Sequence, residues 1–436
     1  MPNRRALALL TPLAALLLGA LAGALTLPPA PNWMAGATVY QMFVRNDTPQ
    51  GTLAASSARL DEVRALGVNT IYLLPIYPTG ALRGKGSLGS PYSVKDYEAI
   101  DPRLGSLADF DAFVSRAHTL GLRVILDIVF NHTAWDNPLV KQHPEWYLHD
   151  ASGSIRSPQA DWSDVAGLDT ARPDVQAYLT SVGLFWLGRG VDGFRADVSG
   201  NLPLSFWQDF RAALKAVNPQ ALLLAETGAP QIHDRAFDLS YDWEGLGRIA
   251  ALANGVITNG FFDYYGYQGG VPKLRYLENH DQERIAGRVP AALLRPLAAL
   301  LLTEPGVPLI YAGQEVGLTH RPSLFDRDPL NWAAGDADLK AWYSTLLRTR
   351  ANLAPLTAPG LRPIDSQPPR LMAFTRFSTL TGGREDKAVV LINLTGSVQT
   401  ARLPWANAWR DALGGELLTP PSVAVPAYGT RILLDH

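Results

Sequence analysis

Two kinds of apolar pattern alternate along the chain and predict strands that alternate with helices. Runs with few polar interruptions, such as Arg123–Phe130, are typical of strands buried on both faces. The segments between them repeat apolar residues with a helical period, and one begins with a capping box at Ser106 and Asp109. The expected strands are Thr38–Val44, Asn69–Leu74, Arg123–Phe130, Gly193–Asp197, Ala221–Glu226, Ala236–Leu239, Lys273–Asn279 and Val307–Tyr311. A helical period also marks Leu53–Leu66, Pro173–Leu187, Pro203–Val217, Trp243–Asn254, Pro290–Thr303 and Leu339–Asn352. This alternation predicts a (β/α)8 TIM barrel of the α/β class.

The alternation is interrupted once and ends before the C-terminus. From residue 131 to 172, Trp, Asp, Pro and His accumulate without periodicity, and so long a loop usually carries function or forms a small subdomain. After Pro355, short β runs separated by Gly, Pro and Asn predict an antiparallel β-sandwich. We therefore expect a barrel over residues 33–130 and 173–355, an inserted domain B over 131–172 after strand 3, and a C-terminal sandwich over 362–436.

The N-terminus carries an apolar segment preceded by basic residues. Arg4 and Arg5 come before an apolar run over residues 6–24, which ends in Ala22-Gly23-Ala24. This order is typical of a secretory signal peptide over residues 1–24, and it predicts an extracellular or periplasmic protein outside the membrane after cleavage. An uncleaved signal anchor is the alternative, because the run approaches membrane-spanning length.

Composition narrows the function classes. A chain of 436 residues suits a large barrel plus an accessory module, and 47% hydrophobic residues allow a sizeable core. The net charge of −2 gives no reason to expect nucleic acid as a partner. Because the chain has no cysteine, disulfides and thiolate chemistry are excluded. No organic cofactor is expected.

Polar residues gather at the carboxyl ends of four expected strands. These ends are Asn131-His132, Arg195-Ala196-Asp197, Ala225-Glu226 and Asn279-His280-Asp281. In a parallel barrel such ends surround the open mouth where active sites lie. Three carboxylates, two histidines and an arginine at one rim therefore predict an active site.

Asp197 and Glu226 are the expected catalytic pair. Side chains alternate faces along a strand, so Arg195 and Asp197 point the same way, and the cation should keep Asp197 ionised. Glu226 ends an apolar strand without a neighbouring cation in sequence, which favours a protonated carboxyl. One ionised and one protonated carboxyl at one bond is the arrangement that glycoside hydrolysis needs. Asp281 would accept hydrogen bonds from sugar hydroxyls and help keep Glu226 protonated, while His132 and His280 would donate to the same hydroxyls.

These segments resemble the α-amylase superfamily, glycoside hydrolase family 13, over nearly the whole chain after the signal. The motifs are Asp127-Ile128-Val129-Phe130-Asn131-His132, Gly193-Phe194-Arg195-Ala196-Asp197, Ala225-Glu226, Glu278-Asn279-His280-Asp281 and Gly89-Ser90-Pro91-Tyr92. The resemblance implies a retaining double displacement on α-linked, mainly α-1,4, starch-type glucans or maltooligosaccharides. It implies Asp197 as nucleophile, Glu226 as acid/base and Asp281 as the third carboxylate. Tyr92 would stack on the sugar being cleaved, and His132, Arg195 and His280 would complete the substrate site.

The resemblance also indicates a calcium site, and at one place the sequence differs from the usual α-amylase motif. Asn131 and Asp169 match positions whose oxygens often bind Ca2+ between the barrel and the inserted loop, and hard oxygen ligands suit this ion. The alternative is that Asn131 only braces the loop through hydrogen bonds. Gly200 and Asn201 stand where many α-amylases have Lys-His that contact leaving-group sugars, so the chain departs from the pattern of standard starch endo-hydrolysis.

Two other functions fit parts of the pattern. A transglycosylase of the same superfamily would use the same residues, with a sugar hydroxyl in place of water at the covalent intermediate. A non-catalytic, membrane-tethered partner protein on the amylase scaffold is disfavoured, because such relatives typically lack the catalytic carboxylates that are present here.

Overall fold

The computed structural model describes residues 26, 28–256, 260–268, 270–365, 367–419 and 421–435. The signal peptide expected over residues 1–24 lies outside the described residues. Within these ranges, no helix is both long enough and apolar enough to cross a membrane.

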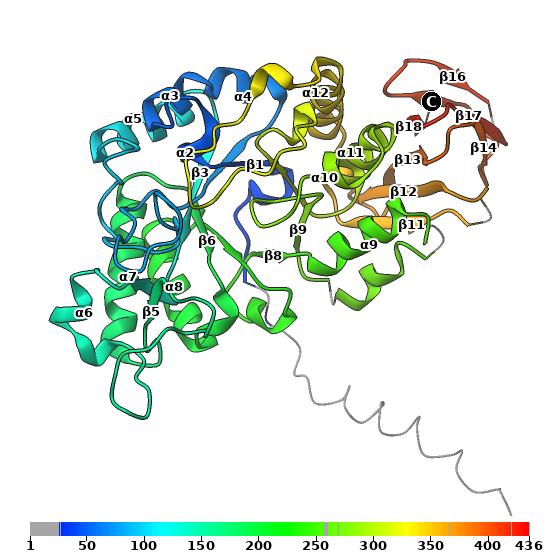
Figure 1. Ribbon diagram of the computed structural model, residues 1–436. Coiled ribbons are helices and arrows are strands. Elements are labelled where there is room, and N and C mark those ends of the chain that lie inside the picture. Colours follow the sequence, from blue (N-terminus) through cyan, green and yellow to red (C-terminus); the bar gives the residue numbers. More distant parts are fainter. Residues whose placement is uncertain are drawn as a thin grey trace, which may run out of the picture.

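Eight parallel strands close into a barrel, which confirms the predicted fold class (Figure 1). Around the barrel the order is β1, β2, β3, β6, β7, β8, β9 and β10, with β10 next to β1. Their bounds are β1 (Val39–Met42), β2 (Thr70–Leu73), β3 (Arg123–Ile128), β6 (Gly193–Ala196), β7 (Leu222–Ala225), β8 (Leu239–Tyr241), β9 (Lys273–Tyr276) and β10 (Val307–Tyr311). Only β8 is displaced, since it begins at Leu239, where the expected run ends. The preceding Asp238 instead braces β7, because its carboxylate accepts a hydrogen bond from the Leu223 amide.

Helices connect the strands. The longer ones are α3 (Leu53–Ala58), α4 (Leu60–Leu66), α5 (Leu107–Thr119), α7 (Pro173–Gly188), α8 (Leu204–Val217), α9 (Trp243–Ala253), α11 (Leu294–Thr303) and α12 (Ala337–Asn352). Four short ones are α2 (Val44–Asp47), α6 (Leu139–Gln142), α10 (Ile285–Arg288) and α13 (Ala354–Thr357). The prediction of a single helix over Leu53–Leu66 is wrong, because the helix is interrupted at Arg59 and forms two shorter helices, α3 and α4. The Arg59 guanidinium pairs with buried Asp47 and lies 3.7 Å from the centre of the Trp332 ring.

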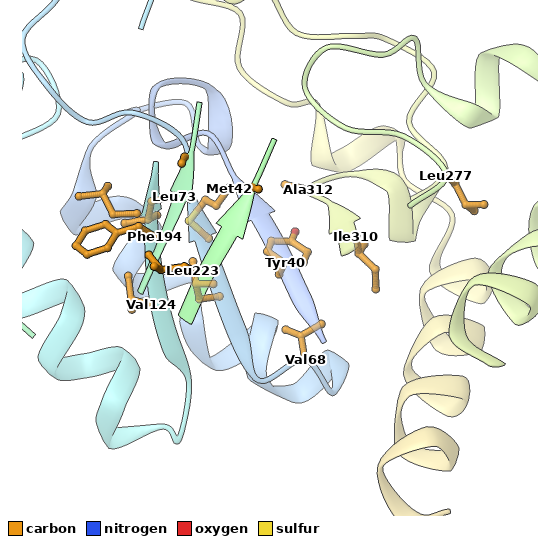
Figure 2. Packing of buried hydrophobic residues seen from close by; sticks show 14 of the residues in the cluster. Tyr40, Met42, Val68, Leu73, Val124, Phe194, Leu223, Leu277, Ile310 and Ala312 are labelled. Atoms are coloured by element: carbon orange, nitrogen blue, oxygen red, sulfur yellow. The ribbon is translucent and has the colours of Figure 1, made fainter. Parts of the chain in front are cut away.

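Alternate residues of each barrel strand belong to two separate apolar cores. In β7, Leu222 and Leu224 belong to the core inside the barrel, whereas Leu223 belongs to the core between strands and helices. Figure 2 shows the second core, which includes Leu223 and, from β1, Tyr40 and Met42. Burial on both faces explains why these strands are almost continuously apolar in sequence.

The inserted segment contains a small sheet. Strands β4 (His132–Ala134) and β5 (Val165–Gly167) pair antiparallel, so the segment expected to lack periodicity still folds back on itself. It leaves β3 and returns to α7, which places it beside the mouth of the barrel.

The C-terminal domain is antiparallel, as predicted. It consists of β11 (Gly360–Pro363), β12 (Leu371–Thr379), β13 (Glu385–Asn393), β14 (Gln399–Arg402), β15 (Trp409–Asp411), β16 (Leu417–Leu418), β17 (Ser422–Val425) and β18 (Thr430–Asp435). A six-stranded sheet and the β14–β17 pair share one apolar core, in which Val389 and Val423 lie. Buried Arg376 of β12 donates to the Thr303 carbonyl at the end of α11 and so ties this domain to the barrel.

The predicted capping box at the start of α5 is present. The Ser106 hydroxyl accepts from the Asp109 amide, and the Asp109 carboxylate accepts from the Ser106 amide. Replacing Ser106→Ala removes one acceptor for the free amides of the first turn, and we expect a loss of about 1 kcal/mol in unfolding free energy. Urea denaturation measures this loss. Ser181→Ala on the exposed face of α7 is the matched control, and an equal effect of both changes would show that the cap is not stabilising.

Candidate active site

The structure brings six of the predicted residues to one pocket at the C-terminal mouth of the barrel. Tyr92, His132, Asp197, Glu226, His280 and Asp281 line this pocket, which has a volume of about 270 Å3. Arg195 is fully buried and contacts the two central carboxylates. The site expected from the strand ends is therefore assembled as one unit.

Strand periodicity explains why charged side chains enter the barrel. In β6, Phe194 and Ala196 belong to the outer core, so Arg195 between them points into the barrel. In β3, Leu126 and Ile128 likewise face outward, and Asp127 points inward. The register of β3 and β6 sets Asp127 directly opposite Arg195.

The Arg195 guanidinium contacts three carboxylates. Its Nη1 lies 2.9 Å from an oxygen of Asp127 and 2.9 Å from Oδ1 of Asp197. Its Nη2 lies 2.7 Å from Oε1 of Glu226. Asp197 and Glu226, which follow neighbouring strands, are thus held by two nitrogens of one rigid fork.

A close approach of β6 and β7 makes this arrangement possible. Gly193 has φ +155°, and a Cβ at this position would lie 2.2 Å from the Leu222 carbonyl oxygen. Any larger residue would push the two strands apart. Glycine at this position therefore lets Asp197 and Glu226 reach the same guanidinium.

Burial raises the pKa values of all three carboxyls despite the arginine. The pKa of Asp127 is raised to about 6, and those of Asp197 and Glu226 are raised to about 7. Desolvation is the largest cause in each case, and Arg195 opposes it. In the described part of the chain, no other Lys or Arg pairs with these three groups. A single cation therefore cannot balance three charges, and the cluster retains protons near neutral pH.

Two sequence-based expectations need correction. Asp197 was expected to be held ionised by Arg195, but its burial outweighs this attraction and its pKa rises. Glu226 was expected to have no cation beside it, but Arg195 reaches it across the strands. The raised pKa of Glu226 agrees with the expectation, although its cause is burial, to which the charges of Asp197 and Asp281 add.

Hydrogen bonds fix the tautomer of His280. Its Nδ1 accepts from the Gln41 side-chain amide at 2.8 Å, and burial lowers its pKa to about 4. The neutral ring therefore carries its proton on Nε2, which lies 2.5 Å from the Tyr92 oxygen. The Tyr92 hydroxyl in turn donates to Asp127 at 3.1 Å. This chain orients both rings, which stack with 5.6 Å between their centres.

His132 is oriented in the same way. The Asn131 side-chain amide lies 3.0 Å from His132 Nδ1, and burial lowers the pKa of His132 to about 4. A neutral ring that accepts at Nδ1 presents an N–H at Nε2. The ring lines the pocket and also makes a hydrogen bond to the Tyr92 backbone, which helps to fix its position.

Val198 turns the backbone sharply after Asp197. It has φ +35° and ψ +43°, a left-handed conformation that is strained for a β-branched residue. This turn directs the Val198 amide to Oε2 of Glu226 at 2.8 Å. Strained backbone persists at a site where surrounding contacts hold it. Here the strained turn places the Val198 amide so that it donates a hydrogen bond to Glu226.

Several residues of the site were not predicted from the sequence. Asp127 lies within a motif noticed in the sequence, but its contact with Arg195 depends on the register between strands. Among the pocket-lining residues that were not predicted, Lys85, Asp164, Leu324 and Phe325 come from loops. Gly84 and Gly86, on either side of Lys85, are the local sequence signal that could have indicated this loop.

The two predicted calcium ligands, Asn131 and Asp169, each take part in a local hydrogen bond. Asn131 is buried, and its amide nitrogen contacts His132 Nδ1. Asp169 accepts from the Ala171 amide at 3.3 Å. Ca2+ takes six to eight oxygen ligands, and within the described ranges no group of three or more His, Cys, Asp or Glu could hold a metal ion. Calcium binding at Asn131 and Asp169 stays a prediction, and no step of the chemistry is derived through it.

The fold and the site together define a (β/α)8-barrel enzyme whose active centre consists of buried carboxylates around one arginine. The catalytic-domain model of the α-amylase family matches residues 39–163 and 266–345. An α-amylase from Lactobacillus plantarum is 32% identical, with a TM-score of 0.84 over 92% of this chain and 98% of that one. A noncanonic maltogenic α-amylase from Thermotoga neapolitana is 29% identical, with a TM-score of 0.82 over the same shares. Neopullulanase 2 from Thermoactinomyces vulgaris is 28% identical over 88% of this chain and 74% of that protein. The chain belongs to the α-amylase family of glycoside hydrolases.

The charge imbalance at Arg195 predicts a stabilising substitution. Asp197→Asn keeps an acceptor for Arg195 and removes one buried charge, so we expect a higher unfolding temperature than wild type at pH 8. The folded-state pKa of about 7 exceeds the unfolded value near 4. The ionised Asp197 therefore lowers the stability of the wild type by its full amount above pH 7, and this loss decreases as pH falls toward 4. The difference in unfolding temperature between Asp197→Asn and the wild type should accordingly be smaller at pH 5.

Thermal unfolding at the two pH values measures this difference. Asp281→Asn is the control, because its carboxylate is 38% exposed and pairs with His280 rather than Arg195. A lower unfolding temperature for Asp197→Asn at pH 8 would show that attraction to Arg195 outweighs burial.

Proposed function

We propose that the protein cleaves α-glucosidic bonds, mainly α-1,4, in starch-type glucans or maltooligosaccharides by a retaining double displacement. The contact of Asp197 and Glu226 with two nitrogens of one guanidinium carries this proposal. Retaining enzymes need two carboxyls roughly 5 Å apart, with no room for a water molecule between the nucleophile and the sugar. A shared guanidinium holds two carboxyls at close quarters on the wall of a single pocket.

The first step breaks the glycosidic bond. An oxygen of ionised Asp197 attacks the anomeric carbon, and Glu226 gives its proton to the departing glycosidic oxygen. The leaving sugar departs as a neutral alcohol, and the glycone stays bound to Asp197 as an ester. As Asp197 loses its charge, the attraction of Arg195 is left to Asp127 and Glu226, which now is a carboxylate.

The second step releases the glycone. Glu226 takes a proton from water, whose oxygen attacks the anomeric carbon and displaces Asp197. The product keeps the configuration of the substrate, and both carboxyls return to their starting states. A pKa of about 7 suits Glu226 to both tasks, because such a group gives and takes protons near neutral pH.

The neighbouring residues suit sugar binding. Asp281 presents a carboxylate at the pocket, and the neutral rings of His132 and His280 line it. The Tyr92 ring provides an apolar face for a sugar ring. The names of the similar proteins, among them an α-amylase and a neopullulanase, support α-glucans as the substrate class.

The secretory route is a separate proposal. The basic residues and apolar run at the N-terminus support export with cleavage after Ala24. N-terminal sequencing of the protein recovered from culture medium or periplasm tests it.

Removal of either catalytic carboxyl should abolish turnover. Asp197→Asn eliminates covalent attack and Glu226→Gln eliminates proton donation, so we expect each to lower kcat on maltoheptaose by several orders of magnitude. Release of reducing sugar measures the rate, and a folded variant with near-normal activity would contradict the assigned role.

The anomeric form of the first product tests the stereochemistry. Proton NMR during the first turnovers on maltoheptaose should show the α-anomer before mutarotation, because two inversions restore the configuration. Early β-anomer would exclude double displacement. The appearance of oligomers longer than the substrate would show transfer to a sugar hydroxyl, and would assign the chain to transglycosylases.

A further inference from the structure

The barrel order distinguishes two sides of the pocket. Glu226 follows β7 and, under the proposed function, protonates the leaving group, so the β7 side receives the leaving sugar. Strand β1 lies across the barrel from β7, and its neighbours are β2 and β10. The loops after β2, β3 and β10 contribute Lys85, Asp164 and Phe325 to the pocket wall. This wall therefore faces the glycone, the part of the substrate that carries the non-reducing end.

An ion pair closes that wall. Lys85 Nζ lies 2.9 Å from Oδ1 of Asp164, and it donates to the Asp161 carbonyl at 3.3 Å. The Asp164 side chain is 6% exposed, whereas that of Lys85 is 38% exposed. The Asp164 backbone carbonyl also accepts from the Ser93 hydroxyl at 3.0 Å. The ion pair thus joins the loop after β2 to the inserted segment, and both Lys85 and Asp164 line the pocket.

The same loop is fixed on its other side. Gly86 has φ +63°, and a Cβ there would lie 2.8 Å from the Phe325 carbonyl oxygen, so only glycine permits this contact. The Leu88 amide donates to that carbonyl at 2.9 Å. The Ser87 amide donates to Asp326 at 2.8 Å. Three loops therefore meet around Lys85 and are joined by these contacts.

We infer that the Lys85–Asp164 pair ends the glycone side of the pocket and binds the non-reducing end of the glucan chain. Besides its contacts with Asp164 and Asp161, the ammonium has one N–H left, and the carboxylate accepts, so together they suit the terminal hydroxyls of a sugar. The pocket volume of about 270 Å3 lies just below the roughly 300–1000 Å3 that is typical of ligand sites. Because a glucan cannot extend past this wall, only its non-reducing end fits the glycone side of the pocket. Cleavage therefore releases short products from the non-reducing end. This inference rests on the proposed function.

Maltoheptaose labelled at its reducing end tests the inference. The wild type should first release short unlabelled sugars, while the label stays on long oligomers. Lys85→Ala opens the wall, and we expect longer unlabelled products and a fall of about tenfold or more in kcat/KM for maltotriose, as for loss of a hydrogen bond to a charged group. The kcat/KM for soluble starch should fall much less, because a long chain can use other contacts.

The chain offers a matched control. Lys95 pairs with Asp136 at 3.1 Å and joins the same two segments, but neither residue lines the pocket. Lys95→Ala should leave the product pattern unchanged. Since Lys85→Ala leaves a buried Asp164 without its cation, the neutral pair Lys85→Gln with Asp164→Asn is measured as well. In this double variant, too, kcat/KM should fall more for maltotriose than for soluble starch.

The outcomes separate this inference from the proposed function. Wild-type hydrolysis with an unchanged product pattern in both Lys85 variants would overturn the chain-end role alone. Early release of long unlabelled products by the wild type would do the same. No hydrolysis of any α-glucan by the folded wild type would overturn the proposed function, and the chain-end role with it.

Discussion

One buried guanidinium determines the chemistry of the site. Arg195 sits inside the barrel and contacts Asp127, Asp197 and Glu226. A single positive charge is too little for three carboxylates, and burial prevents water from compensating. The pKa values of Asp197 and Glu226 consequently rise to about 7. Such an arrangement costs stability, and it keeps a proton available at the place where a glycosidic oxygen would need one.

The barrel could be predicted because its signal is local. Strands buried on both faces are almost continuously apolar, and the alternation along β6 placed Arg195 and Asp197 on one face. The capping box of α5 is equally local, since Ser106 and Asp109 lie within one turn. The break at Arg59 was missed, because its cause is a contact with Asp47 and Trp332 rather than a change in apolar period.

The electrostatics could not be predicted in the same way. Sequence adjacency showed the arginine next to Asp197, but it could not show that Arg195 also reaches Glu226 and Asp127. Those contacts depend on the register between β3, β6 and β7, and on the close approach at Gly193. The expected direction of the Asp197 pKa shift was wrong, because burial outweighs the attraction of Arg195, and Asp127 and Glu226 also compete for that one positive charge.

The strands and the loops therefore have separate roles. Strand register fixes the carboxyls, and it does so through side chains that point into the barrel and cannot move without disturbing both apolar cores. The pocket wall at Lys85 depends instead on loops, which are joined through ion pairs and hydrogen bonds at its rim. Changes in the wall alter the space available to the substrate without altering the contacts of Arg195. A protein built in this way can keep one reaction while the length of chain that it accepts is set elsewhere.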